Sequence, residues 1–310
     1  MMKSFSEKKP GLIMPNDLKS IKGKATYWIF FSILIILCIT TFFPAIWMVL
    51  TAFKSTQEIY SSTAFFPKEF SFMIAIKRIV TAWKSLELGR SMVNTIIVSI
   101  GNVIAQIFIC GLSGYVLSKL RVKGTKLVFV LVVWTMMMPS AIRTVPTYMS
   151  YISFPFVVDD KLNVMTNINI LDTYVPLWLG AAANSFNIIL FKNNFDSIPT
   201  ALVEAARIDG CSDFKTFYKI MIPIALPVVI FVCIGALSGT WANYFTPYLV
   251  LKDPAKMTTP ARIFMLKSDA SITANIYMMG LIFASIPSLI IFIVFQKYIV
   301  GGVTLGAVKG

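Results

Sequence analysis

The chain has 310 residues, of which 57% are hydrophobic and 14% are charged, and its mean hydropathy is +0.76. Soluble domains carry about 25% charged residues, so this composition excludes an ordinary soluble domain and indicates an integral membrane protein. The absence of histidine excludes imidazole metal sites and histidine-based acid–base catalysis. The net charge of +14 does not indicate nucleic-acid binding, because the basic residues flank hydrophobic stretches and form no stripe with stacking aromatic residues.

Residues 1–26 are polar and basic, and they predict a cytoplasmic N-terminal arm. The apolar segment that follows is too long for a cleaved signal peptide and has no A-x-A cleavage site. We therefore expect this segment to remain in the protein as its first transmembrane helix.

Long stretches without charged residues predict six transmembrane helices in an all-α domain over residues 27–299. Five of the stretches are long enough for the roughly 20 residues that cross a hydrocarbon core. The predicted spans are residues 27–51, 92–118, 126–148, 173–192, 223–246 and 276–297.

The third span is unusual because only residues 127–142 are free of charge. At 1.5 Å per residue this stretch is about 24 Å long, short of a core of about 30 Å. Pro139 and Pro146 predict a kink or an end of the helix there. We expect Arg143 to lie near the outer boundary and to snorkel; the alternative is that it faces an internal, water-filled path.

Lysine and arginine counts predict that both termini are cytoplasmic. With six spans, the arm, the loops 119–126 and 192–222 and the tail 297–310 carry sixteen basic residues, whereas the opposite loops carry twelve. Positive residues are enriched on the cytoplasmic side of membranes. The opposite side then includes residues 52–90, in which Met73, Ile76, Val80 and Trp83 predict an amphipathic helix that lies along the interface or against the bundle.

The longest polar interruption in the second half of the chain is residues 196–223, here called the 196–223 hairpin. Ser197 is a candidate N-cap, and Pro199 suits a first helical turn. Gly210 fits a left-handed, helix-ending position, and Ser212 is a candidate N-cap for a second helix. The second helix has one predicted apolar stripe: Phe214, Phe217, Tyr218 and Met221. The pattern predicts a helix–turn–helix outside the bilayer, between the fourth and fifth spans.

Six residues of this hairpin carry a family resemblance: Glu204, Ala205, Ala206, Asp209, Gly210 and Phe217. Their spacing resembles the EAA loop of permease subunits of binding-protein-dependent ABC importers. Cys211 departs from the usual alanine but is also small. The resemblance implies that the hairpin is the coupling helix that docks into an ATPase subunit. The alternative is a hairpin that merely joins two spans.

The same resemblance implies an assembly in a bacterial cytoplasmic membrane. Its other parts would be a second homologous permease subunit, two ATPase subunits and an external solute-binding protein. Alternating access would then move the substrate, with the 196–223 hairpin as the coupling element.

Trp241 and Asn243 lie near the outer half of the fifth span. They resemble the tryptophan-plus-polar cluster that is common there in carbohydrate-type permeases. We take Trp241 and Asn243, together with Asn184, as candidate substrate-pathway residues, because an aromatic ring stacks on a sugar and an amide reads its hydroxyl groups. The alternative is an interfacial aromatic belt that includes Tyr244 and Tyr248.

The last residues, 300–310, resemble the C-terminus of the smaller maltose-type permease. The resemblance implies a cytoplasmic tail that docks on the ATPase through Gly306 and Lys309. The alternative is a frayed tail.

Energy for transport has to come from outside this chain. There is no G-x-x-x-x-G-K-[ST] phosphate loop, so we expect ATP and Mg²⁺ to be bound by the partner ATPase and no cofactor to be bound here. The span interiors carry no acidic residue, which argues against ion coupling, and no paired carboxylates or metal ligands indicate an enzyme. The sequence favours a subunit of an importer of a sugar or oligosaccharide. A passive channel or another transporter of small polar solutes stays open as the alternative.

Overall fold

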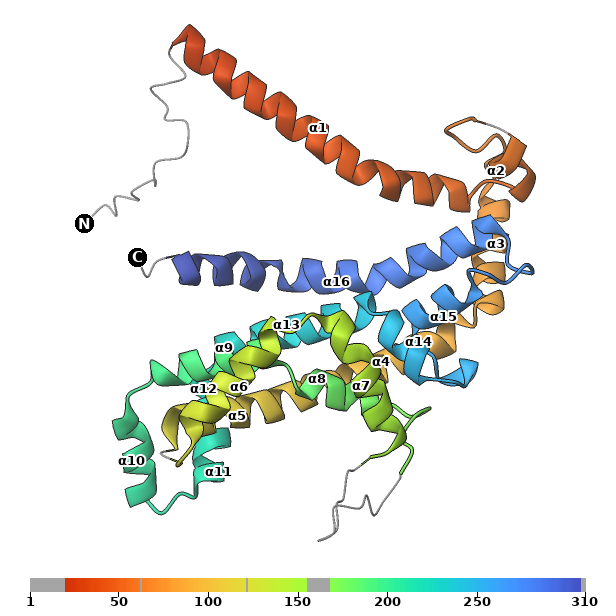
Figure 1. The fold of residues 1–310 in the computed structure, drawn as a ribbon. Helices are drawn as coiled ribbons and strands as arrows, with labels where there is room; N and C mark the ends of the chain where they lie inside the picture. Colours follow the sequence, from red (N-terminus) through yellow and green to blue (C-terminus); the bar gives the residue numbers. More distant parts are fainter. Residues whose placement is uncertain (1–19, 62, 121, 155–167, 308–310) are drawn as a thin grey trace.

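The computed structural model describes residues 20–307 except 62, 121 and 155–167, and these residues form helices almost throughout (Figure 1). The one pairing of extended backbone in this part of the chain is an isolated bridge between Phe154 and Ile168. The longer helices are α1 (Ile21–Ala52), α3 (Phe72–Ser85), α4 (Leu88–Ala105), α5 (Gly111–Lys119), α6 (Thr125–Met137), α7 (Ser140–Ile152), α8 (Val175–Ala182), α9 (Ser185–Asp196), α10 (Thr200–Ile208), α13 (Leu226–Ala242), α15 (Thr259–Leu266) and α16 (Ala274–Ala307). Shorter elements are α2 (Thr56–Ser61), α11 (Asp213–Thr216), α12 (Ile222–Ile224), α14 (Phe245–Val250), the π-helical turns η2 (Gln106–Cys110) and η3 (Phe217–Met221), and the 3₁₀ turn η4 (Pro254–Lys256). The predicted all-α fold is confirmed.

Three continuous helices among the described residues are long and apolar enough to cross a membrane: Ile21–Ala52, Leu88–Lys119 and Ala274–Tyr298. Two bent pairs raise this number to five if each pair is one span. The predicted fourth span is divided into α8 and α9 at residues 183–184. The count of six spans therefore stays a prediction.

The predicted third span is not one straight helix. It consists of α6 and α7, whose axes are bent by 111° at a break that includes Pro139. Proline fixes its own φ and disfavours the helical conformation of the residue before it, and Met138 is extended, with ψ at 125°. Pro146 lies inside α7 and does not end that helix.

The N-terminal helix α1 leaves the body of the molecule and approaches α16 near its own C-terminal end (Figure 1). The Oγ of Ser20 caps it by accepting a hydrogen bond of 2.9 Å from the backbone N–H of Gly23. The last six residues of the predicted arm, 21–26, are already helical. The apolar side chains of α1 are mostly exposed; Ile36, for example, is 60% exposed.

The helix pair α5 and α9 forms the centre of one hydrophobic core. Gly114 permits their close approach, because a Cβ atom at this position would lie 2.7 Å from the Cβ of Phe191. Phe191, Phe195 and Tyr115 are fully buried in this core. A second core joins α3, α4, α15 and α16, and Trp83 of the predicted amphipathic helix packs there, edge-on, 5.5 Å from the ring of Phe283. All four residues of its predicted apolar face are nevertheless exposed: Met73, Ile76, Val80 and Trp83.

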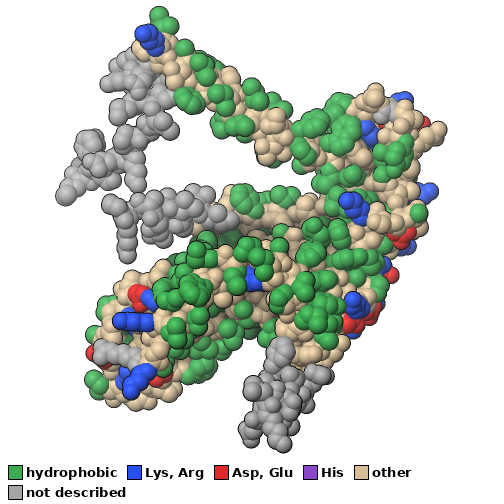
Figure 2. Space-filling view, viewed as in Figure 1, with side chains coloured by type: hydrophobic (Ala, Val, Ile, Leu, Met, Phe, Trp, Pro, Cys, Tyr) green, Lys and Arg blue, Asp and Glu red, His purple; other side chains and the backbone are tan. Residues whose placement is uncertain are grey.

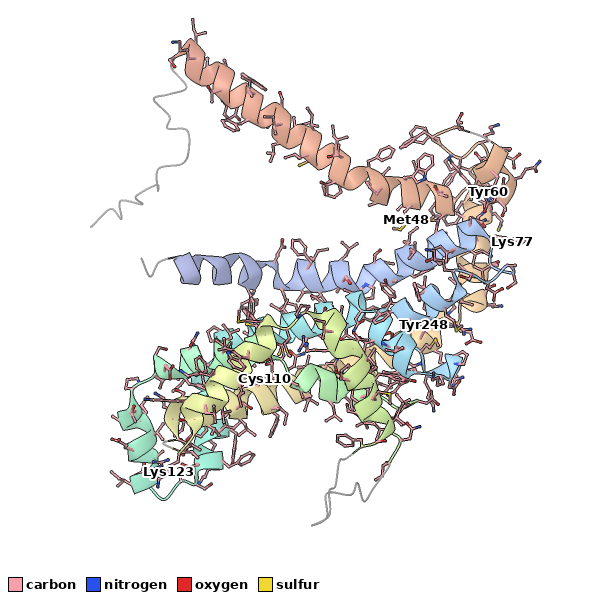
Figure 3. All side chains as sticks on the ribbon, viewed as in Figure 1. Met48, Tyr60, Lys77, Cys110, Lys123 and Tyr248 are labelled. Atoms are coloured by element: carbon pink, nitrogen blue, oxygen red, sulfur yellow. The ribbon has the colours of Figure 1, made fainter. Side chains whose placement is uncertain are left out.

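Charged side chains gather at two ends of the molecule, with hydrophobic side chains between them (Figure 2). One end holds α10 and α11, the first turn of α1 and the last turns of α16 (Figure 1). Lys123 lies at this end, and Lys77 lies at the opposite end (Figure 3). The arrangement agrees with a common side for the 196–223 hairpin and for the described ends of the chain.

Candidate functional site: a polar cavity joined to the 196–223 hairpin

A cavity of about 610 Å³ lies among α4, α7, α8, α9, α13 and α14. Its volume is in the range of about 300–1,000 Å³ that is typical of small-molecule sites. The second span contributes one face, with Val98 and Asn102 of α4 and Gln106 of η2 at spacings of four. The polar lining residues are Asn102, Gln106, Ser140, Arg143, Thr144, Thr147, Tyr148, Tyr151, Asn184, Asn187, Thr240, Asn243 and Thr246.

Hydrogen bonds between helices hold several of these polar groups in place. The Nδ2 of Asn187 on α9 donates to the Oε1 of Gln106 at 2.6 Å, and both residues are buried. The Nδ2 of Asn102 on α4 donates to the Oγ1 of Thr240 on α13 at 2.8 Å. The Oδ1 of Asn102 is buried and has no hydrogen-bond partner within the described part of the chain.

The π-helical turn η2 starts at Gln106, where the second span meets the cavity. Such turns inside α-helices are rare and occur frequently at functional sites. Beyond it, the helix continues as α5 to Lys119. Asn102, Gln106 and Asn187 were not among the sequence-based candidates, although uncharged polar residues inside apolar spans are a signal that would have found them.

The three predicted pathway residues are in different surroundings. Asn184 and Asn243 both line the cavity. The side-chain oxygen of Asn184 caps α9 by accepting from the N–H of Asn187 at 3.0 Å, and the side-chain oxygen of Asn243 accepts from the N–H of Thr246 at 3.2 Å. Trp241 is only 8% exposed and does not line the cavity. Aromatic rings reach the cavity instead from Tyr148, Tyr151, Phe186, Phe231 and Phe245. The predicted role of the three residues in transport stays a prediction.

Arg143 lines the cavity and its side chain is exposed, and the interpretation that it snorkels to the outer boundary stays a prediction. The bend before α7 turns this helix away from the direction of α6. The alternative, in which Arg143 faces an internal path, agrees with its position.

The 196–223 hairpin has the predicted two helices and the predicted left-handed glycine. Gly210 has φ of +75°. Its N–H donates to the carbonyl of Arg207 at 3.0 Å, and the N–H of Cys211 donates to the carbonyl of Ala206 at 2.9 Å. These two bonds form a Schellman motif, which satisfies the last carbonyls of α10. The turn is closed by an ion pair of 3.0 Å between Arg207 and Asp213.

Two details of the hairpin differ from the sequence-based interpretation. Ser197 does not cap α10: it follows α9, and its Oγ donates to the carbonyl of Asn194 at 2.7 Å. Pro199 takes the N-cap position instead of the first turn. The predicted cap of the second helix is present, because the Oγ of Ser212 accepts from the N–H of Lys215 at 3.3 Å.

The predicted apolar stripe of the second helix is only half buried. Phe217 and Met221 are buried, at 2% and 0% exposure, whereas Phe214 and Tyr218 are 51% and 45% exposed. The π-helical turn from Phe217 to Met221 changes the register, so the four side chains do not form one continuous packed face.

The hairpin is fixed to α5 and α9 by packing and by polar contacts. The ring of Phe217 lies 5.7 Å from that of Tyr115, and Val203 of α10 is buried in the same core. The Nζ of Lys119 donates to the carbonyl of Ile198 at 2.6 Å. The carboxylate of Asp196 accepts from the Oγ of Ser118 on α5 at 2.6 Å. The same carboxylate pairs with Lys192 on α9 at 2.6 Å.

The Asp196 carboxyl group titrates below its ordinary range. Partial burial opposes its ionisation, but the hydrogen bonds from Lys192 and Ser118 outweigh this effect and lower its pKa. The group is therefore a carboxylate at neutral pH and keeps both contacts.

The outer face of α10 is not covered by any other described part of the chain. Glu204, Ala205 and Asp209 are exposed, and Ile208 is 87% exposed, whereas Ala206 is buried at 4%. Of the six residues that carry the resemblance, four therefore point outward and Ala206 and Phe217 pack inward. At the other predicted docking element, Gly306 lies within the last turn of α16, and Lys309 lies outside the described residues.

Comparison with known proteins gives a family match over more than half of the chain. The family model described as "Binding-protein-dependent transport system inner membrane component" matches residues 108–304. Two similar proteins come from Bacillus subtilis strain 168. The "Probable ABC transporter permease protein YurM" is 27% identical over 93% of this chain and 89% of its own length. The "Polygalacturonan/rhamnogalacturonan transport system permease protein YtcP" is 28% identical over 94% of this chain and 100% of its own length.

A solved structure has the same fold. It is described as a bacterial ABC transporter involved in the import of the acidic polysaccharide alginate, and its matched chain has a TM-score of 0.72 to this one. The alignment covers 90% of this chain and 98% of the other at 21% sequence identity.

Proposed function

Because the chain belongs to the family of binding-protein-dependent transport system inner membrane components, we propose that it is the permease subunit of an ATP-driven saccharide importer. A second permease subunit and two ATPase subunits complete the transporter, and an external binding protein delivers the saccharide. The ATPase subunits bind ATP and Mg²⁺. The complex lies in the bacterial cytoplasmic membrane with both termini of this chain in the cytoplasm.

The observation that carries this proposal is a pair of helices that connects the cavity with the 196–223 hairpin. The helix α9 begins at the cavity beside Asn187 and ends at Asp196, where the hairpin starts. The second span passes from Gln106 at the cavity to Lys119, which holds the carbonyl of Ile198. Because both helices are packed and hydrogen-bonded at each end, a displacement of the hairpin moves both walls of the cavity.

The exposed face of α10 is the docking surface for the ATPase in this proposal. Glu204 offers a carboxylate to a basic residue, Ala205 permits a close approach, and Ile208 offers an apolar contact. Closure of the ATPase subunits displaces the hairpin as a rigid body, and the cavity alternates between its outer and inner openings. Switching a two-state protein from 1:99 to 99:1 requires a differential free energy of about 5.5 kcal/mol, so a stiff attachment is essential.

The lining of the cavity supports a saccharide as the substrate. Amides and hydroxyl groups, with several aromatic rings, match the hydroxyl groups and the apolar faces of sugars. Two of the matched proteins are named for the transport of polysaccharides. A passive channel is the less favoured function, because it gives no role to a rigid hairpin with an exposed face.

Purification of the complex after co-expression with the genomic neighbours tests this function. We expect a second permease and an ATPase to co-purify, and a saccharide-loaded binding protein to stimulate ATP hydrolysis in lipid. Recovery of the chain alone, without stimulated hydrolysis, would contradict the proposal.

A matched pair of variants separates docking from folding. Ala205→Trp adds bulk on the exposed face, so the chain should insert and remain folded but lose the ATPase. Ala206→Trp adds the same bulk at a position that is 4% exposed, so it should lower the abundance of the folded chain. Normal ATPase recovery with folded Ala205→Trp would place the docking surface elsewhere.

A further inference from the structure

One ionised residue stands out in the cavity. Of the described residues that line it, Arg143 is the only one with a formal charge at neutral pH, and the other polar lining residues are amides, hydroxyl groups and phenols. A guanidinium group does not lose its proton in proteins, so it keeps this charge wherever it lies. The cavity is therefore a neutral saccharide-type site with one added positive charge.

The position of Arg143 on α7 follows from the amphipathic character of this helix. The cavity-lining residues of α7 recur at spacings of three and four: Ser140, Arg143, Thr144, Thr147, Tyr148 and Tyr151. The opposite face carries Ile142, Val145 and Met149, which are 66%, 68% and 57% exposed. The polar face thus points inward to the cavity and the apolar face outward, so Arg143 belongs to the cavity wall.

Arg143 has no ion pair in the described part of the chain. The four ion pairs found there join other residues, and none of the hydrogen bonds involves its side chain. The side chain is exposed, so its charge is open to the cavity, and ionisable residues within membrane domains often mark substrate pathways. The charge of Arg143 is therefore available to an anionic ligand or to another subunit.

We propose that Arg143 binds a carboxylate of the transported saccharide, which makes the substrate class an acidic, uronate-containing oligosaccharide. This inference rests on the proposed function. A guanidinium group binds a carboxylate through two parallel hydrogen bonds, whereas a neutral sugar hydroxyl group gives it no compensating charge. The amides and hydroxyl groups that line the rest of the cavity face the neutral parts of the same ligand.

Matched saccharides test the proposal in the intact complex reconstituted in lipid. The probes are uronate trisaccharides, trigalacturonate and trimannuronate among them, and the same compounds after reduction of each carboxyl group to a hydroxymethyl group. Uptake and stimulated ATP hydrolysis are measured with the binding protein present. We expect the acidic members to be transported, and Arg143→Gln to lower their uptake by about tenfold to a hundredfold.

Control variants identify the role of the charge. Arg143→Lys keeps the charge without the two-pronged geometry and should recover part of the uptake. Val145→Ala changes the opposite face of α7 and should affect the acidic and the reduced saccharides equally.

Three outcomes would overturn the proposal. Wild-type uptake of the reduced saccharides that equals uptake of the acidic ones, together with uptake of the acidic ones that is unchanged in Arg143→Gln, would show a neutral substrate, while leaving the importer function intact. An equal loss for acidic and reduced saccharides, with separation of the two permease subunits, would assign the arginine to a carboxylate of the second subunit. The absence of stimulation by any saccharide would contradict the importer function itself.

Discussion

The attachment of the 196–223 hairpin to the transmembrane core depends on Phe217. Its side chain is 2% exposed, and its ring lies 5.7 Å from the ring of Tyr115. The contact with α5 is so close that a Cβ on Gly111 would be 3.2 Å from this ring. Truncation of a phenylalanine in such a site costs about 3–5 kcal/mol, so Phe217→Ala should loosen the hairpin by roughly this free energy.

Phe214 provides a matched control on the same helix. It is 51% exposed, so its truncation forfeits about half of the burial of a phenylalanine, or about 1 kcal/mol. Thermal unfolding of the purified complex in detergent should therefore show a clearly larger loss for Phe217→Ala than for Phe214→Ala. Equal losses would refute the reasoning that Phe217 is the packing anchor.

Phe217→Ala should also weaken the coupling of ATP hydrolysis to transport. A loss of about 3–5 kcal/mol is most of the roughly 5.5 kcal/mol that a complete switch requires. Phe217→Ala should therefore hydrolyse ATP in proteoliposomes but transport less saccharide for each ATP consumed. A wild-type ratio of transport to hydrolysis in this variant would show that the stiffness of the hairpin is not needed.

Gly210, Gly114 and Asp172 give further tests of the local geometry. Gly210→Leu should cost about 1–2 kcal/mol through the φ of +75° alone, since no atom lies within 4 Å of an added Cβ. The similarly sized Gly210→Asn should cost less. Equal proteolytic sensitivity of the hairpin in the two variants would contradict this. Gly114→Val should cost about 3 kcal/mol or more, because its Cβ would lie 2.7 Å from α9, whereas Gly235→Ala, with open space around it, should be near neutral in thermal unfolding. The backbone N–H of Asp253 and the side chain of Lys256 lower the pKa of Asp172 below that of an ordinary aspartate. Its stabilising contribution is therefore present above the ordinary aspartate pKa and is lost as the pH falls through the lower, folded-state pKa. Asp172→Asn should remove this acid-dependent part of the unfolding profile, and an unchanged profile would contradict it.

The local chemistry of the hairpin was readable from the sequence. A glycine that ends a helix, a serine that caps the next one and an apolar repeat each act over a few residues, so the positive φ of Gly210 and the cap at Ser212 were predicted correctly. The cap at Ser197 was wrong, because Pro199 shifts the start of α10 and leaves Ser197 at the end of α9.

Other features depend on contacts between distant segments, and no local pattern contains them. The cavity brings Asn102, Asn187 and Thr240 together from α4, α9 and α13, and the packing of these helices on one another sets their distances. Trp241, a pathway candidate from the sequence, is buried and does not line the cavity.

The sequence by itself determined the membrane class, the all-α fold and the position of the hairpin, because composition, hydrophobic runs and turn residues are properties of single segments. Only the tertiary structure decided where Arg143 lies. The charge count placed it at the end of a short span, and the bend of 111° between α6 and α7 turned its helix so that the polar face lines the cavity. The direction of a helix after a proline break is set by the surfaces on which it packs, and those surfaces come from the rest of the chain.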